Sequence, residues 1–187
     1  MEKSDTSSRR AFLVSTTATG LLAAGSTTAC QDAAMTDRRL VFASFADAQR
    51  ELDRLSKLPK LKSAAVWSWP QTLTHCAQSI EFSLTGFPRP KSALFQSTAG
   101  AAAFKVFSWR GRMSHDLAEP IPGAPTLDTS TDTAAALARL QKAITDFQAN
   151  TGPLRPHFAY GELSKPEYEQ AHAMHIANHL SGFDTPA

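Results

Sequence analysis

Three histidines crowd the stretch AHAMHIANHL, residues 171–180. In a helix each residue turns by about 100°, so His172, His175 and His179 would share one face within an arc of roughly 60°. His175 and His179 are four residues apart, the spacing that lets two imidazoles hold one metal ion. A polar helix edge without metal is the alternative interpretation, because two ligands alone bind a metal weakly.

A metal site at this helix therefore needs a further donor from elsewhere in the chain. His75 lies in the middle of a predicted helix within WSWPQTLTHCAQSIEFSLTGFP, residues 67–88, where core-type residues flank it. Three protein nitrogens with one open position form the catalytic type of zinc site. We expect a divalent metal cofactor, with zinc as the first expectation and nickel or iron as alternatives, because imidazole suits all three. A buried histidine satisfied by a hydrogen bond is the alternative for His75.

Other reactive side chains are weaker candidates. Cys76 adjoins His75, but adjacent helical residues point about 100° apart, so a small buried residue is the better interpretation. The segment WRGRMSHD, residues 109–116, sets Arg110, Arg112, His115 and Asp116 at the entrance to a long loop, where it could bind a substrate. These arginines are candidates for binding a carboxylate or phosphate of a substrate, and solvated loop charge is the alternative.

The elements that would position these residues are predicted to be helices. Apolar residues at helical spacing, together with capping residues and prolines, predict five helical segments. These run from Ser44 to Pro59, from Pro70 to Gly86, from Ser92 to about Arg110, from Thr131 or Asp132 to the stretch NTGPLRP, and from Ser164 onward. The stretch AGAAA, residues 99–103, would let a neighbouring helix approach closely. No convincing strand is found, so we expect an all-α bundle.

Residues 111–130 contain Pro120, Pro122, Pro125 and Gly123, which predicts a long crossover loop between the third and fourth helical segments. In bundles with such a connection, facing helices commonly hold metal or cofactor sites in the core.

The beginning of the chain has the layout of an export signal. The paired Arg9 and Arg10 precede an apolar run that ends in small residues, which resembles a twin-arginine signal. We therefore expect residues 1–30 to be a signal read by the twin-arginine export machinery, residues 31–37 to be a linker, and the protein to be periplasmic. A lipid anchor on Cys30 is an alternative fate of this segment.

Composition fits one soluble domain, predicted over residues 38–183. Apolar residues make up 42% of the chain and charged residues 19%, as in ordinary globular proteins. The formal net charge is only +2, from scattered basic residues, so we expect no nucleic-acid partner.

Two separated motifs carry a family resemblance. The stretch around His75, quoted above, and HFAYGELSKPEYEQAHAMHIANHL near the end resemble the DUF1569 family, a branch of the DinB/YfiT-like metalloenzyme superfamily. The resemblance covers roughly residues 38–183. It implies a four-helix bundle of DinB/YfiT type, with a long crossover loop and a short extra helical segment. It also implies that His75, His175 and His179 bind one divalent ion, and that His172 hydrogen bonds to a ligand or substrate.

These observations support two functional hypotheses. The first is an exported, divalent-metal-dependent enzyme acting on a small molecule, and the resemblance implies a transferase that uses a low-molecular-weight thiol, or a hydrolase. The second is a non-enzymatic envelope protein that binds a ligand or partner and uses its histidines structurally. A homodimer is compatible with both.

Overall fold

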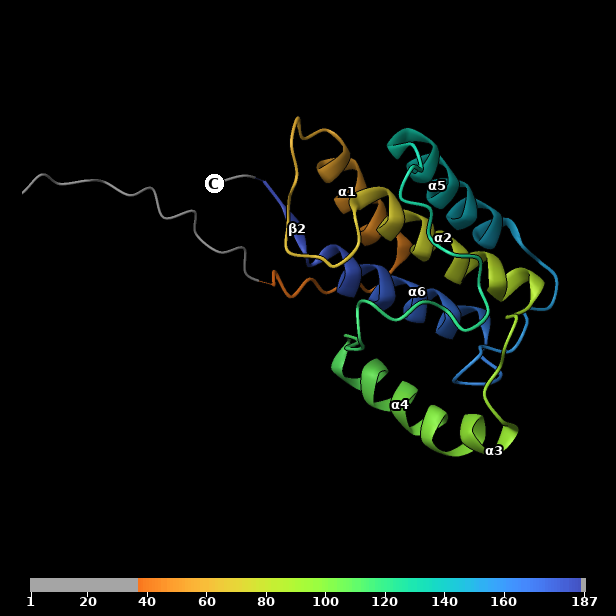
Figure 1. Ribbon diagram of the computed structural model, residues 1–187. Coiled ribbons are helices and arrows are strands. Elements are labelled where there is room, and N and C mark those ends of the chain that lie inside the picture. The colour runs from red at the N-terminus through yellow and green to blue at the C-terminus, as the bar shows by residue number, and fades with distance from the viewer. Residues whose placement is uncertain (1–36, 186–187) are drawn as a thin grey trace, which may run out of the picture. The chain divides into compact units, whose positions relative to one another are not determined.

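The computed structural model describes residues 37–185, so the predicted signal at residues 1–30 and almost all of the predicted linker lie outside the described residues. The described part of the chain is mostly helical with little strand (Figure 1). Its helical elements are α1 (Phe45–Ser56), α2 (Trp69–Thr85), α3 (Ala93–Phe95), the π-helical turn η1 (Gln96–Gly100), α4 (Ala101–Arg110), α5 (Thr133–Ala149) and α6 (Lys165–Leu180). In the described part of the chain, no helix has both the length and the apolar character required to cross a membrane.

The helices begin where capping residues predict. The backbone N–H of Ser44 donates to the side chain of Asp47 at 3.1 Å, and that of Ser164 donates to Glu167 at 2.8 Å. Ser68 uses Gln71 in the same way at 3.0 Å, with Pro70 in the first turn of α2. Each contact satisfies a backbone donor that the helix itself leaves free. These local interactions set the starts of α1, α2 and α6.

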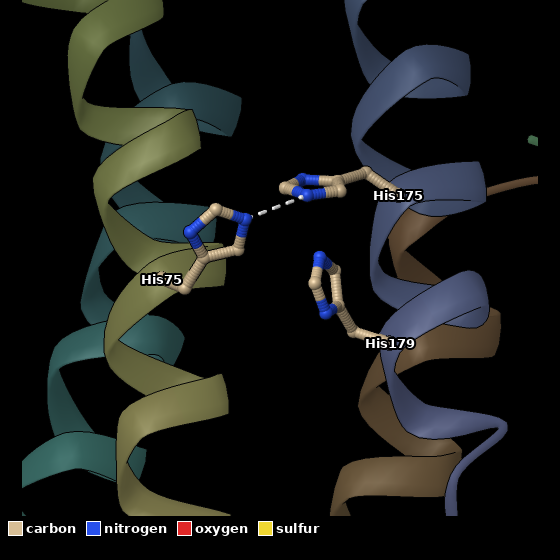
Figure 2. A group of neighbouring side chains, drawn as sticks. All are labelled: His75, His175 and His179. Carbon is tan, nitrogen blue, oxygen red and sulfur yellow. Dashed lines mark hydrogen bonds between the residues drawn. The ribbon is translucent and has the colours of Figure 1, made fainter. Parts of the chain in front are cut away.

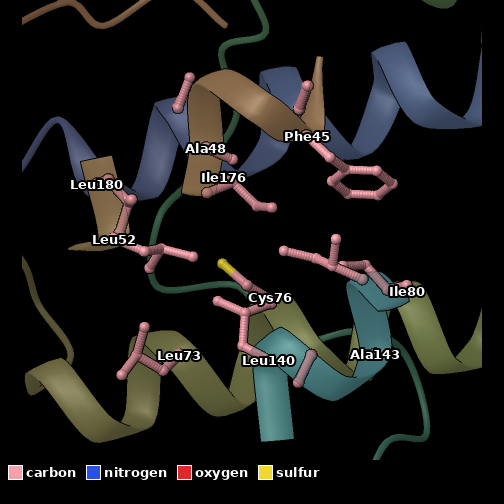
Figure 3. Packing of buried hydrophobic residues seen from close by; sticks show 14 of the residues in the cluster. Phe45, Ala48, Leu52, Leu73, Cys76, Ile80, Leu140, Ala143, Ile176 and Leu180 are labelled. Atoms are coloured by element: carbon pink, nitrogen blue, oxygen red, sulfur yellow. The ribbon is translucent and has the colours of Figure 1, made fainter. Parts of the chain in front are cut away.

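One hydrophobic core joins α1, α2, α5 and α6. Phe45 of α1 meets Phe147 of α5 edge to face, with ring centroids 5.4 Å apart. The Cys76 side chain lies among apolar residues of this core (Figure 3), and burial raises the pKa of its thiol to about 12. Cys76 is therefore a neutral packing residue, as its position beside His75 predicts.

The alanine-rich stretch AGAAA was expected to pack against a neighbouring helix. A loop packs there instead, because the backbone of Ala159, in the loop before α6, lies against Gly100. A Cβ on Gly100 would stand 1.9 Å from the Ala159 carbonyl oxygen. The Gln96 side chain donates to the carbonyl oxygens of His157 and Phe158 at 3.3 and 3.1 Å, and so holds this loop against η1.

The crossover, residues 111–132, contains no helix or strand, as predicted. Its path is set by α2, because Gln71 and Gln78 donate to the carbonyl oxygens of Leu127 and Pro125 at 3.2 and 3.1 Å.

Two short strands were not predicted. Strand β1 (Lys62–Ser63) pairs antiparallel with β2 (Phe183–Asp184). Two residues are too few to produce an alternating pattern in the sequence. The pairing ties the end of the chain to the segment that leads into α2.

Candidate metal centre

Three histidines meet between α2 and α6, as Figure 2 shows. His75 comes from the middle of α2, while His175 and His179 stand one turn apart on α6. One ligand atom from each ring lies within 4.8 Å of the other two, and the Nε2 atoms of His75 and His175 are 3.1 Å apart. Two nitrogens on one tetrahedral zinc are about 3.4 Å apart, so the three rings lie within reach of a common ion.

The three rings are buried yet incompletely hydrogen bonded. Their exposed fractions are 2% for His75, 8% for His175 and 3% for His179. Nδ1 of His75 and Nε2 of His179 have no hydrogen-bond partner. Buried polar atoms normally have one, and Nε2 of His179, which faces the other two rings in Figure 2, would gain a partner from an ion held there. The donor set fits a divalent ion, and these three residues could bind one.

Electrostatics keep these rings neutral near pH 7. Burial, with the positive charge that His115 would carry, lowers the pKa of His75 to about 4. Burial holds the pKa values of His175 and His179 well below the usual histidine range, and repulsion among the histidines adds to this effect. A neutral imidazole offers the lone pair that metal binding requires. Neutral rings would not have to lose a net positive charge before a cation binds.

Trp67 covers one side of the three histidines. Its ring stacks on His179, with centroids 5.7 Å apart and planes 10° from parallel, and it lies 4.6 Å from His75. Trp67 lies just before α2, where the sequence predicts a packing residue at the start of the helix. Its ring also limits the movement of the His75 and His179 rings.

A cavity of about 120 Å³ opens beside the histidines. His75 and His175 form part of its wall, and the remainder combines apolar, aromatic and acidic side chains. A cavity of about 150 Å³ can hold a molecule of the size of benzene, so this one accommodates a small molecule or one end of a larger one. Its other lining residues include Met113, Ile121, Phe158, Tyr160, Asp116 and Glu119.

His172 lies on the same helix but in a different environment. It stacks on Phe45 and Tyr168, with centroids 6.1 and 5.3 Å away, and it also lines the cavity. Its Nε2 is buried without a partner, and burial lowers the pKa of the ring to about 3. The structure shows no hydrogen bond from His172 to His175 or His179. The predicted hydrogen bond from His172 would therefore be made to a molecule bound in the cavity.

His157 also lines the cavity, and its ring is fixed by its own loop. Nδ1 accepts hydrogen bonds from the backbone N–H groups of Ala159 and Tyr160 at 3.1 and 3.2 Å. The ring stacks on that of Tyr160 at 4.2 Å, and burial lowers its pKa to about 3. These contacts make His157 a rigid part of the cavity wall.

Sequence reasoning placed His115 in the loop segment considered for substrate binding, but not beside the candidate metal ligands, where the crossover carries it. Its ring centroid lies 5.1 Å from those of both His175 and His179. No periodicity or spacing connects a loop residue with a helix sixty positions away, so only the path of the crossover shows this proximity. The proline-rich composition around it indicated only a loop.

The two arginines predicted to bind substrate lie elsewhere. Arg110 is exposed at the end of α4 and Arg112 is half-buried, and neither belongs to the cavity wall. The charged residues that do line the cavity, Asp116 and Glu119, are acidic.

Comparison with known proteins gives one match. The model of the family described as "Protein of unknown function (DUF1569)" matches residues 34–186, close to the span over which the two motifs resemble that family. Neither a search of curated proteins nor a search of solved structures finds a significant match. Because the family model covers most of the sequence, including all three histidines between α2 and α6, the chain belongs to the DUF1569 family.

Proposed function

We propose that this protein is a metal-dependent enzyme that holds a divalent ion through His75, His175 and His179 and acts on a small molecule in the neighbouring cavity. The carrying observation is that three buried imidazoles from two helices converge on one point, and two of them, His75 and His175, line a cavity. Zinc is the ion we expect first, with nickel and iron as alternatives that the same ligands suit.

The proposed reaction is a transfer that uses a low-molecular-weight thiol, or a hydrolysis. A divalent ion held by three imidazoles supplies Lewis-acid chemistry, since it lowers the pKa of a coordinated water or thiol. The buried side chains of Met113 and Ile121 offer an apolar surface for the rest of the molecule and exclude water from it. The rigid His157–Tyr160 pair forms an aromatic wall that restricts its orientation.

Two further parts of the proposal concern ancestry and location. We place the core of α1, α2, α5 and α6 with the four-helix bundles of the DinB-like superfamily. Support comes from the position of the candidate ligands, one on the second of these helices and two at HxxxH spacing on the last. Export to the periplasm through the twin-arginine machinery is proposed from Arg9 and Arg10, and cell fractionation of a double-lysine variant tests it.

The metal proposal is tested on the untagged mature protein by measuring bound element per chain with mass spectrometry. We expect about one divalent ion in the wild type and a large loss in His75→Ala and His179→Ala. Ser79→Ala is the matched control, because Ser79 lies one turn from His75 on α2 and lines the same cavity. It should retain the metal. Near-zero metal in the wild type, or equal metal in all variants, contradicts the proposal.

Turnover is tested by incubating the metal-loaded protein with small thiols and with ester and amide substrates. Metal binding that stabilises the fold while no compound is converted would instead support the non-enzymatic alternative, an envelope ligand- or partner-binding protein with structural histidines.

A further inference from the structure

We infer that His115 is a fourth metal ligand, supplied by the crossover, and that metal binding draws this loop inward over the three helical histidines. The inference rests on the proposed metal centre and goes beyond it, because it assigns a donor outside the helices and a coupled movement of the loop.

The first support is the position of the ring. The centroids of His75, His175 and His179 lie 4.7 to 5.0 Å from one another. His115 continues this arrangement at 5.1 Å from both His175 and His179. With Zn–N bonds of about 2.0–2.1 Å, imidazole rings on one tetrahedral ion have centres about 5 Å apart. His115 therefore stands at the separation of a ligand from two of the other rings.

The second support is the hydrogen bond that His115 already makes. Its Nδ1 lies 3.1 Å from the carbonyl oxygen of Asp116. A carbonyl oxygen only accepts, so Nδ1 carries the proton and donates it. Nε2 is then left with a free lone pair. A metal-binding histidine commonly donates its other ring N–H to a carbonyl or carboxylate in this way, which fixes its tautomer and orientation.

The third support is charge. A divalent ion on neutral imidazoles leaves two positive charges uncompensated in a buried site. Asp116 and Glu119, in the same loop as His115, line the cavity beside His75 and His175. The negative charges of their carboxylates would attract a cation held at the histidines and so favour its binding.

The fourth support is that His115 lies just outside the group of three. The ligand atoms that lie within 4.8 Å of one another belong to His75, His175 and His179, whereas His115 is exposed at the surface. An inward shift of its loop would bring Nε2 to the ion. Gln71 and Gln78 hold the crossover at Leu127 and Pro125, ten or more residues further along, so the segment that carries His115 is free of these two contacts.

The test compares wild type, His115→Ala and Ser114→Ala, all untagged and stripped of metal. Ser114 is an exposed neighbour in the same loop, and both changes lie on the surface. Zn²⁺ affinity is measured by competition with a chromophoric chelator, and Co²⁺ absorption reports the ligand number. We expect His115→Ala to bind Zn²⁺ at least about tenfold more weakly, since even partners that only contact a ligand contribute 10- to 100-fold. Its Co²⁺ spectrum should change and return towards that of the wild type when free imidazole is added.

Hydrogen exchange is the second readout. Zn²⁺ should slow exchange in residues 112–119 of the wild type and of Ser114→Ala, but not of His115→Ala. Equal Zn²⁺ affinity and identical Co²⁺ spectra in wild type and His115→Ala overturn the inference and leave the three-histidine site intact. A wild type that binds neither ion overturns the proposed function itself.

Discussion

The Nε2 atoms of His75 and His175 lie 3.1 Å apart, although 100 residues separate the two in the chain. Both rings are neutral near pH 7, so one of the facing nitrogens carries a proton that the other accepts. Ligation through both Nε2 atoms requires each ring to carry its proton on Nδ1. Nδ1 of His75 is buried without a partner. If an ion binds through both Nε2 atoms, the proton that lies between them would have to move to an Nδ1 atom.

Zinc should stabilise the folded protein. Binding to the native state alone raises the free energy of unfolding by about 2.7 kcal/mol at 100 times Kd. We expect this gain in urea or thermal unfolding of the wild type and of Ser79→Ala, and little of it in His179→Ala. An equal gain in His179→Ala would place the ion somewhere other than among these three histidines.

Acid should destabilise the metal-free protein. In the folded state the pKa values of His157 and His172 are about 3, against 6.5 for an unperturbed histidine. The unfolded chain therefore binds more protons as pH falls from about 6.5 towards 3, and the stability present above pH 6.5 is lost over that range. Each such histidine contributes at most about 1.4 kcal/mol per pH unit.

His172→Phe isolates one of these contributions, because the ring stacks between Phe45 and Tyr168 and an aromatic replacement preserves its shape. Urea unfolding with chelator at pH 7.5, 6.5 and 5.5 should give a shallower pH dependence for the variant, by about one proton. An unchanged slope would show that His172 titrates normally in the folded state.

Gly100→Ala should destabilise the fold even though alanine favours helix. The added Cβ would meet the Ala159 carbonyl oxygen at 1.9 Å, so backbone must shift. We expect a loss of about 1–3 kcal/mol, typical of overpacking. Gly152→Ala is the control, because its nearest contact is an ordinary 3.4 Å to the Asn150 side chain. Chemical denaturation measures both, and equal stabilities would argue against the close approach of this loop.

Cys76→Ser should lower stability without removing metal. The side chain is buried in the apolar core, and a hydroxyl without a partner there costs about 1–3 kcal/mol. Metal analysis of the variant should give the stoichiometry of the wild type. A loss of metal without a loss of stability would make the thiol a ligand and contradict its assignment as a packing residue.

Local signals predict the helices well because their causes are local. Ser44, Ser164 and Pro70 act within one turn of the residues that they cap or initiate, so the starts of α1, α6 and α2 can be read from short stretches. The pairing of β1 with β2 was not predictable in this way, since two-residue strands leave no periodic pattern.

The candidate site also combines features that local sequence predicts with features that depend on long-range contacts. The four-residue spacing of His175 and His179 on a helix determines from sequence that their rings are neighbours. The contribution of His75 was expected from family resemblance and from its central place in a helix, but no local rule aims it at α6. The close packing of α2 and α6 in one core decides that.

His115 and the two arginines mark what only the tertiary structure decided. The sequence places all three in or beside one proline-rich loop, and cannot say which of them faces the cavity. The packing of Met113 against α4 and α6 holds the start of the loop, so that His115 lies near α6 while Arg110 and Arg112 stay outside the cavity wall. Spacing along one helix fixes an angle between side chains. The position of a loop depends instead on contacts between residues far apart in the chain, which no short stretch of sequence contains.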